Sequence, residues 1–363
     1  MNETGKPLLT HLTLMLTYYC NMSCPMCGQV YSKRRIKEYA YLPIEMIKSQ
    51  IENCHDLKSV YLFGGEPLLY PEFDELVKYL YEKKLTILMT TNGLELHKHI
   101  DSIVNYVTDI SISIDSNNKA DFESIRSKNT YDKVMSNYRL LLEECRKHNS
   151  SLQIGLNIVI MKENCRYLLE LNEYFLKDID VINRINYEVP ITISRCVGEK
   201  YQKVCDEQFG MKVDTWTWFC DKLENFSEEE IDMIEQAVRR LKEFPKVTFL
   251  APVVDLKKFL LNDENISNSI CQFSYHSCSI LPNGDVTFCV DFPDYILGSI
   301  FVDNIVSIFD NKKARDFREY FEKKGNLPIC QRCPRIFNDM AMSLKLYATT
   351  LVVTHILIRN IMW

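Results

Sequence analysis

Short apolar runs alternate with longer amphipathic stretches between residues 11 and 193. The short runs suit strands, and the longer stretches repeat their apolar positions every three to four residues, as helices do. Strands are predicted at residues 12–16, 59–63, 86–89, 110–114, 153–160 and 184–193. Helices are predicted at residues 44–53, 72–83, 96–105, 131–147 and 165–176. This alternation is typical of an α/β protein with a parallel sheet.

Six such strand–helix units fit a partial (β/α)6 barrel, for which we expect residues 1–250 to suffice. Ser227 and Glu230 form a capping-box pattern before a helix predicted at residues 231–244, and a short strand at 246–250 would end the barrel. In such a barrel, chemistry is expected on the loops at the carboxyl ends of the strands.

Residues 195–226 interrupt the alternation, because they hold Cys196, Cys205 and Cys220 together with two tryptophans and show no clean period. They are predicted to form a long loop or insertion near the substrate. A packed connector whose tryptophans fill the core is the alternative.

The composition and charge of the chain argue against several classes of protein. The net charge of −6 and the lack of a long basic run argue against nucleic-acid binding. The chain has 14 cysteines, some in two groups of short spacing, which indicates metal ligation in a reducing cytoplasm more than a disulfide framework. Charged residues interrupt the apolar tail at residues 341–363, so a covering helix is favoured over membrane contact.

The strongest motif is Cys20, Cys24 and Cys27, spaced C-x3-C-x2-C after the first strand. Three thiolates on one loop can hold three irons of a four-iron cluster and leave the fourth open to a small ligand. Gly64-Gly65-Glu66-Pro67 follows the second strand. Glycine allows close backbone approach, and a carboxylate complements an ammonium group.

In order and content, these motifs resemble the radical S-adenosylmethionine (SAM) superfamily. The resemblance implies that the three cysteines hold a four-iron cluster whose open iron binds SAM. It also implies that Gly64 to Pro67 meet the methionyl ammonium, and that Met26 packs on adenine where the family usually has an aromatic residue. The implied reaction is reductive cleavage of SAM to a 5′-deoxyadenosyl radical, with electrons from a donor such as flavodoxin or ferredoxin.

Polar residues at later strand ends are further candidates for contacts with SAM by the same resemblance. They are Asn92, Ser113, Asp115, Arg126 and Asn157, of which Arg126 would pair with the SAM carboxylate. Ordinary turn or helix-cap chemistry is the alternative for each of them.

A second group of cysteines lies near the end of the chain. Cys271 precedes a hairpin predicted at residues 279–289, which ends in Cys289, and a helix predicted at residues 304–323 leads to Cys330 and Cys333. The hairpin could bring one cysteine beside the C-x2-C pair. By spacing alone, zinc is a competitor for such a site.

The stretch from Gly284 to Cys289 and the terminal C-x2-C resemble the SPASM/twitch extension of radical SAM enzymes, here a small α+β domain at residues 251–340. The resemblance implies one auxiliary four-iron cluster, held by Cys271, Cys289, Cys330 and Cys333. Cys278 is an alternative ligand.

The sequence indicates the catalytic residues and the substrate less specifically than it indicates the two cysteine groups. Asp291 is a candidate general base, and Cys205 or Cys220 could donate a hydrogen atom to a substrate radical. The barrel begins within about ten residues of the first methionine, which favours a small substrate of sugar or cyclitol type. Peptide maturation is the alternative, and a non-catalytic metal-binding protein is the rival of another class.

Overall fold

The structure is a computed structural model that describes residues 6–28, 41–220, 226–250, 256–261 and 271–333. Within these ranges, ten strands form one sheet in the order β10-β9-β8-β1-β2-β3-β4-β5-β6-β7. The strands are β1 (His11–Met15), β2 (Ser59–Phe63), β3 (Thr86–Thr91), β4 (Asp109–Ser113), β5 (Gln153–Val159), β6 (Ile182–Glu188), β7 (Val247–Leu250), β8 (Ser277–Ile280), β9 (Asp285–Thr287) and β10 (Ile296–Ser299). The predicted α/β fold is confirmed, and the predicted strands 12–16 to 246–250 are all present, with ends shifted by up to five residues.

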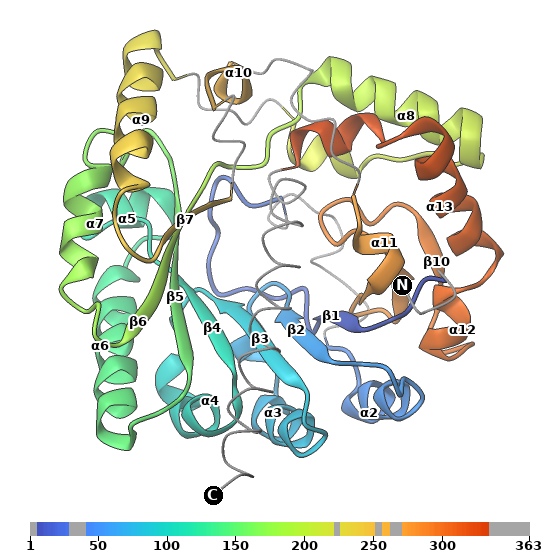
Figure 1. Cartoon of the computed structure of the whole chain (residues 1–363), viewed down its shortest axis with the longest axis horizontal. Coiled ribbons are helices and arrows are strands. Elements are labelled where there is room, and N and C mark those ends of the chain that lie inside the picture. Colours follow the sequence, from blue (N-terminus) through green and yellow to red (C-terminus); the bar gives the residue numbers. More distant parts are fainter. Residues whose placement is uncertain (1–5, 29–40, 221–225, 251–255, 262–270, 334–363) are drawn as a thin grey trace, which may run out of the picture.

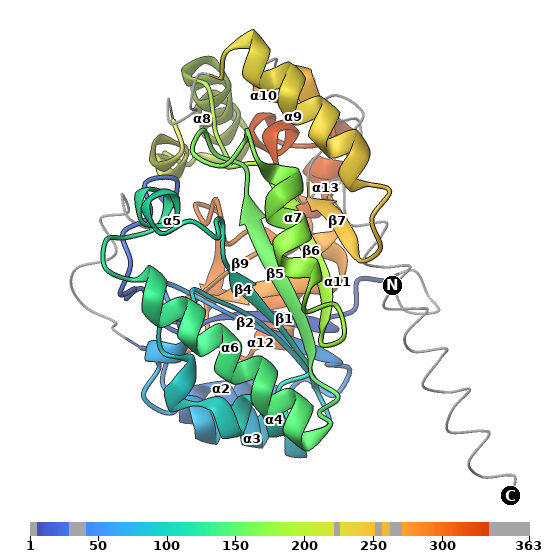
Figure 2. The same ribbon diagram turned by 90° about the vertical axis from the view of Figure 1, so that its left-hand side faces the viewer.

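Helices α2, α3, α4, α6 and α7 cover the outer side of the curved sheet (Figure 1). The helices within the described residues are α2 (Ile44–Glu52), α3 (Phe73–Glu82), α4 (Ile100–Tyr106), α5 (Lys119–Ile125), α6 (Tyr131–His148), α7 (Leu168–Leu176), α8 (Arg195–Phe209), α9 (Glu228–Leu241), α10 (Leu256–Leu260), α11 (Phe273–His276), α12 (Ile305–Phe309) and α13 (Lys312–Lys324). Short 3₁₀ helices occupy Pro67–Leu69, Leu96–Lys98, Thr215–Trp218 and Pro328–Arg332. The side view shows α6 and α7 running along the outside of β4 and β5 (Figure 2).

The two faces of the sheet differ in polarity because successive side chains of a strand point to opposite faces. On β4, Ile110 and Ile112 are fully buried in the hydrophobic core, whereas Asp109, Ser111 and Ser113 share the other face. This polar face continues to β6, two strands away, where Arg184 forms an ion pair with Asp109 and donates to the Ser111 hydroxyl. The inner face is therefore polar at β4 to β6, whereas Met15 and Phe63 make it apolar at β1 and β2.

The hairpin of the second cysteine region extends the barrel sheet. β8 pairs with β1 in parallel, at Leu12 opposite Cys278, and β8 and β9 then pair in antiparallel fashion. The predicted hairpin is confirmed, but its sheet is continuous with that of the barrel. The predicted helix at residues 304–323 is two helices, because the Asn304 and Asn311 side chains each cap a new helix start.

The expectation of an irregular segment at residues 195–226 is wrong for its first half, which forms α8. The Ser194 side chain accepts a hydrogen bond from the Val197 N–H, and Gly210 ends the helix in the left-handed conformation. Val197, Tyr201 and Cys205 recur at a four-residue spacing and are buried. This helical period is hidden in the sequence by the polar and charged residues between them.

The expected covering helix at residues 341–363 lies outside the described residues. Among the helices that are described, none combines the length and the apolar character that crossing a bilayer demands.

His11, at the start of β1, should make stability depend on pH. Its ring packs edge-on against His276, with centroids 5.3 Å apart. Burial, and then the nearby His276 and Lys58, lower the pKa of His11 from 6.5 to about 4. The unfolded chain therefore binds more protons between these values, so stability falls as pH drops from about 6.5 to about 4. We expect His11→Gln to reduce the fall in thermal midpoint between about pH 7 and about pH 5.

The exposed His97 provides the control, because its replacement by glutamine leaves the half-buried His11 unchanged. Equal pH dependence of the midpoint in His11→Gln and wild type would contradict the assignment.

Candidate active site

The loop after β1 gathers Cys20, Cys24 and Cys27. The Met22 N–H donates to Cys20 Sγ at 3.4 Å, and the Cys27 N–H donates to the Cys24 carbonyl at 3.1 Å. Burial raises the pKa of Cys20 to about 12, with smaller contributions from Glu66, Cys24 and Cys27. The three thiols are thus close enough to interact electrostatically, and a bound metal would have to stabilise their thiolate forms.

Gly64 and Gly65 let a second loop run directly beside the cysteine loop. The Gly65 N–H donates to the Thr17 carbonyl at 2.8 Å, and the Glu66 N–H donates to the Tyr19 carbonyl at 2.7 Å. A Cβ on Gly65 would lie 2.0 Å from the Tyr19 oxygen, and Gly64 has a φ of +151°. The glycines are required for the contact between these two loops.

Glu66 is 1% exposed, and both of its carboxylate oxygens accept hydrogen bonds from other residues. Its Oε1 accepts from the Thr91 hydroxyl at 2.6 Å and the Leu68 N–H at 3.1 Å, and its Oε2 accepts from the Asn92 N–H at 2.8 Å. Burial raises the pKa of Glu66 to about 7, although these hydrogen bonds oppose the shift. Glu66 therefore links the loop after β2 to the end of β3, and its predicted contact with an ammonium group stays a prediction.

Asp115 and Arg126 form a buried ion pair beside the cysteine loop. Arg126 Nε and Nη2 both donate to the Asp115 carboxylate, the latter at 2.9 Å, and Asp115 Oδ1 also accepts from the Val159 N–H at 2.7 Å. Burial raises the pKa of Cys24, whereas the adjacent Arg126 opposes that shift. The guanidinium thus touches a cysteine of the motif, and its predicted pairing with the SAM carboxylate is untested.

The remaining residues predicted to contact SAM lie at strand ends on the same edge. Ser113 ends β4 opposite Asn157 of β5. The Asn157 side chain accepts from Asn186 Nδ2 at 2.8 Å, and Asn186 in turn accepts from the Thr248 hydroxyl. Pro67 begins the 3₁₀ helix after Glu66, and Met26 is half-buried against the core. The edge that holds the cysteine motif therefore also carries an amide network.

The second cysteine group also converges. Burial raises the pKa of Cys289, with further contributions from Asp291, Cys333 and Cys271. It raises the pKa of Cys330 as well, and Cys271, Cys289 and Cys333 add to this shift. The hairpin and the C-x2-C pair have thus come together as predicted.

Cys278 lies apart from this group. It is fully buried in β8, and its electrostatic neighbours are Cys54 and Arg318. The structure does not support it as a ligand of the second group. Within the described ranges, no three His, Cys, Asp or Glu side chains converge on a point suited to a single metal ion.

Two family models match the chain at these two cysteine groups. The model of the radical SAM superfamily matches residues 14–175, and a model described as an iron-sulfur cluster-binding domain matches residues 271–334. The chain belongs to the radical SAM superfamily. Its cofactors are SAM and four-iron clusters, for which groups of thiol donors are the appropriate ligands.

Relatives of this radical SAM protein are enzymes of several kinds. GTP 3′,8-cyclase of Synechocystis sp. is 34% identical over 173 residues, which cover 45% of this chain and 49% of the cyclase. The antilisterial bacteriocin subtilosin biosynthesis protein AlbA of Bacillus subtilis is 25% identical over 320 residues, which cover 85% of this chain and 61% of AlbA. The chain thus spans about half of the first relative and less than two-thirds of the second.

Solved structures agree in fold. SuiB of Streptococcus suis, in a crystal structure with the precursor peptide SuiA, superposes with a TM-score of 0.61 at 15% sequence identity, covering 90% of this chain and 71% of SuiB. At this identity the likeness concerns the fold.

The three residues predicted to be catalytic lie in different places. Cys205 is buried in α8 beside Tyr201 and Tyr320. Cys220 follows Phe219, whose ring packs so closely on Gly28 that a Cβ there would lie 2.3 Å from it. Asp291 is half-buried near Cys289. The residue before Cys220 thus contacts the first cysteine loop, and Asp291 lies next to the second group. Cys205 lies on α8, which packs against the 3₁₀ helix that carries Cys330.

Asp294, which no sequence motif indicates, joins α8 to the second cysteine region. Its carboxylate accepts hydrogen bonds from the Tyr201 hydroxyl at 3.0 Å and from both the N–H and the hydroxyl of Thr215. Burial raises the pKa of Asp294. No local motif signals this role, because its partners lie 79 and 93 residues away in the sequence.

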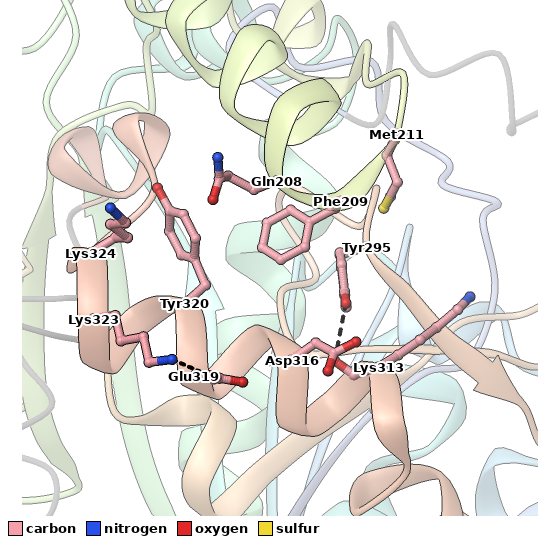
Figure 3. A pocket seen from close by; sticks show the side chains of 10 residues that line it. All are labelled: Gln208, Phe209, Met211, Tyr295, Lys313, Asp316, Glu319, Tyr320, Lys323 and Lys324. Carbon is pink, nitrogen blue, oxygen red and sulfur yellow. Dashed lines mark hydrogen bonds and ion pairs between the residues drawn. The ribbon is translucent and has the colours of Figure 1, made fainter.

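A groove of about 550 Å³ lies between the end of α8 and α13 (Figure 3). Its walls combine aromatic and charged side chains. They include Phe209, Tyr295, Tyr320, Lys313, Asp316 and Glu319. Burial raises the pKa of Tyr320, and the nearby Cys205 and Cys330 contribute, so this side chain connects the groove to the second cysteine group.

Gly65→Ala should disrupt the contact between the two loops. Because the new Cβ would meet the Tyr19 backbone oxygen at 2.0 Å, the loops must separate. We expect a loss of about 3 kcal/mol in the free energy of unfolding. Gly210→Ala is the control, since only its left-handed conformation opposes the change and should cost about 1 kcal/mol. Equal losses in denaturant unfolding would contradict this assignment.

Proposed function

We propose that this protein is a radical SAM enzyme in which Cys20, Cys24 and Cys27 hold the SAM-binding cluster. The supporting observation is that the loop carrying the three thiols lies against the Gly64–Pro67 loop, with Cys20 beside Asn92 and Cys24 beside Arg126. When bound, the cluster and SAM supply a 5′-deoxyadenosyl radical that abstracts a hydrogen atom from the substrate. Three thiol donors in a loop without a fourth cysteine suit a cluster with one open iron.

The residues of this chain have separate tasks in the proposed site. Gly64 and Gly65 allow the loop after β2 to lie against the cysteine loop, and Glu66 holds the end of β3 in register with it. Asp115 holds Arg126, whose guanidinium places a positive charge at Cys24, where thiolate charge accumulates when metal binds. Ser113 and Asn157 present polar groups on the same inner face for contacts with SAM.

The second group is proposed to hold one auxiliary four-iron cluster through Cys271, Cys289, Cys330 and Cys333. The mutual influence of these thiols on their pKa values supports this set over one that includes Cys278. An auxiliary cluster offers a place for the electron left on an oxidised substrate. Asp291, near Cys289, is the candidate base for the accompanying proton.

Iron analysis tests this assignment. Anaerobically reconstituted wild type should contain about eight irons per chain, and the Cys330→Ala, Cys333→Ala double variant about four, because one cluster loses two ligands. Cys278→Ala is the matched control and should retain about eight irons. Stoichiometric zinc without iron in the wild type would instead support a structural zinc protein.

A peptide is the proposed substrate. The supporting observation is the match to a bacteriocin biosynthesis protein across 85% of this chain. The sugar or cyclitol substrate predicted from the sequence is the second candidate, favoured by the polar inner face formed by Asp109, Ser111, Arg184 and Asn186. Peptides and polyols, each incubated with enzyme and SAM, are compared by mass spectrometry. The class of molecule that loses a pair of hydrogen atoms is the substrate class.

SAM cleavage is the direct test of the chemistry. With dithionite and SAM under anaerobic conditions, wild type should form 5′-deoxyadenosine, measured by chromatography, and the Cys20→Ala, Cys24→Ala, Cys27→Ala variant should form none. Cys196→Ala, at an exposed position of α8, is the control that should retain the activity. Product from the triple variant at the wild-type rate would refute the assignment of these ligands.

A further inference from the structure

The side-chain amide of Asn92 lies against the first cysteine of the motif. Its Nδ2 is 3.7 Å from Cys20 Sγ, a hydrogen-bond distance for sulfur, and 2.8 Å from Asn21 Oδ1. A primary amide carries two N–H groups, so one is available for each of these acceptors. Asn92 thus donates to the sulfur of a residue proposed to bind iron.

The orientation of this amide is determined by its other contacts. Asn92 Oδ1 accepts from the Leu94 N–H at 2.9 Å, so the opposite, donating side must face Cys20. The Asn92 backbone N–H donates to Glu66 Oε2 at 2.8 Å, and the side chain is buried at 8% exposure. The backbone carbonyls of Gly93 and Leu94 are in turn held by Asn137 Nδ2 at 2.9 and 3.0 Å.

A second layer holds Asn21, whose Oδ1 accepts the other hydrogen bond from Asn92 Nδ2. Asn21 Nδ2 donates to Glu95 Oε1 at 3.4 Å. Glu95 forms ion pairs with Lys98 at 2.7 Å and with Lys133 at 3.4 Å. A charged group therefore fixes Asn21, and Asn21 fixes the rotamer of Asn92.

The sulfurs of the motif have different surroundings. Cys20 Sγ accepts from the Met22 N–H and from Asn92, whereas Cys24 interacts with the Arg126 guanidinium. Hydrogen bonds to ligand sulfurs are one of the determinants of the reduction potential of an iron–sulfur cluster. A donor stabilises the reduced form more, because that form carries one more negative charge.

We propose that Asn92 is a positioning residue that sets the reduction potential of the SAM-binding cluster through its hydrogen bond to Cys20. This inference rests on the proposed function, because it requires the cluster to be held by Cys20, Cys24 and Cys27. The amide raises the potential, which makes the cluster easier to reduce by a one-electron donor.

Asn92→Asp tests this role with little change in shape. The carboxylate keeps an acceptor for the Leu94 N–H and replaces the donating NH2 by an oxygen that repels the Cys20 thiolate. The control is Asn105→Asp, which adds the same charge at an exposed position of α4. The midpoint potential is measured by a redox titration followed by electron paramagnetic resonance, on the signal that changes when SAM is added.

We expect Asn92→Asp to lower the midpoint potential, with about a tenfold change in the ratio of oxidised to reduced cluster at a fixed potential, or about 59 mV for one electron. Asn105→Asp should keep the wild-type potential. An unchanged potential in Asn92→Asp would overturn the inference.

If Asn92→Asp binds too little iron for a titration, the midpoint potential of Asn92→Ala is measured instead, because this variant removes the donor without adding charge. A lower potential supports the inference, and a wild-type potential overturns it. A wild type that binds iron but shows no signal sensitive to SAM would instead refute the proposed function, so the two failures are distinguishable.

Discussion

The site depends on the backbone contact between the loops that follow β1 and β2. The two strands pair in parallel through Met15 and Phe63, and the pairing continues beyond them as the Gly65 and Glu66 N–H groups donate to the Thr17 and Tyr19 carbonyls. This contact has no room for a Cβ at Gly65. It places the Gly64–Pro67 motif beside the cysteine loop.

Glu66 extends this arrangement to the third strand. Its two oxygens accept hydrogen bonds from the 3₁₀ helix after β2 and from the end of β3, so the carboxylate acts as a buried cross-link between these segments. Asn92, held by Glu66, then reaches Cys20. The same edge of the sheet therefore combines a rigid frame with groups that face the cysteine sulfurs, as a centre that must bind a charged cofactor requires.

The two cysteine regions are parts of one structure. β8 continues the sheet beside β1, and the Phe219 ring packs between Gly28 of the first loop and Phe292, whose ring centroid is 5.2 Å away. Phe292 lies three residues after Cys289. Elements that are far apart in sequence thus place Gly28 of the first cysteine loop and Phe292 of the second cysteine region against the same Phe219 ring.

Local sequence patterns determined the strands, most helices, the cysteine motifs and the hairpin, because alternation, helical period and turn chemistry act between near neighbours. They did not reveal α8, whose buried period of four is masked by charged residues, or the continuity of β8 with β1. Tertiary structure alone decided that Asn92 faces Cys20, that Arg126 touches Cys24, and that Cys278 is separate from the second group. These contacts join residues many positions apart, and only the folded sheet brings the ends of its parallel strands to one edge.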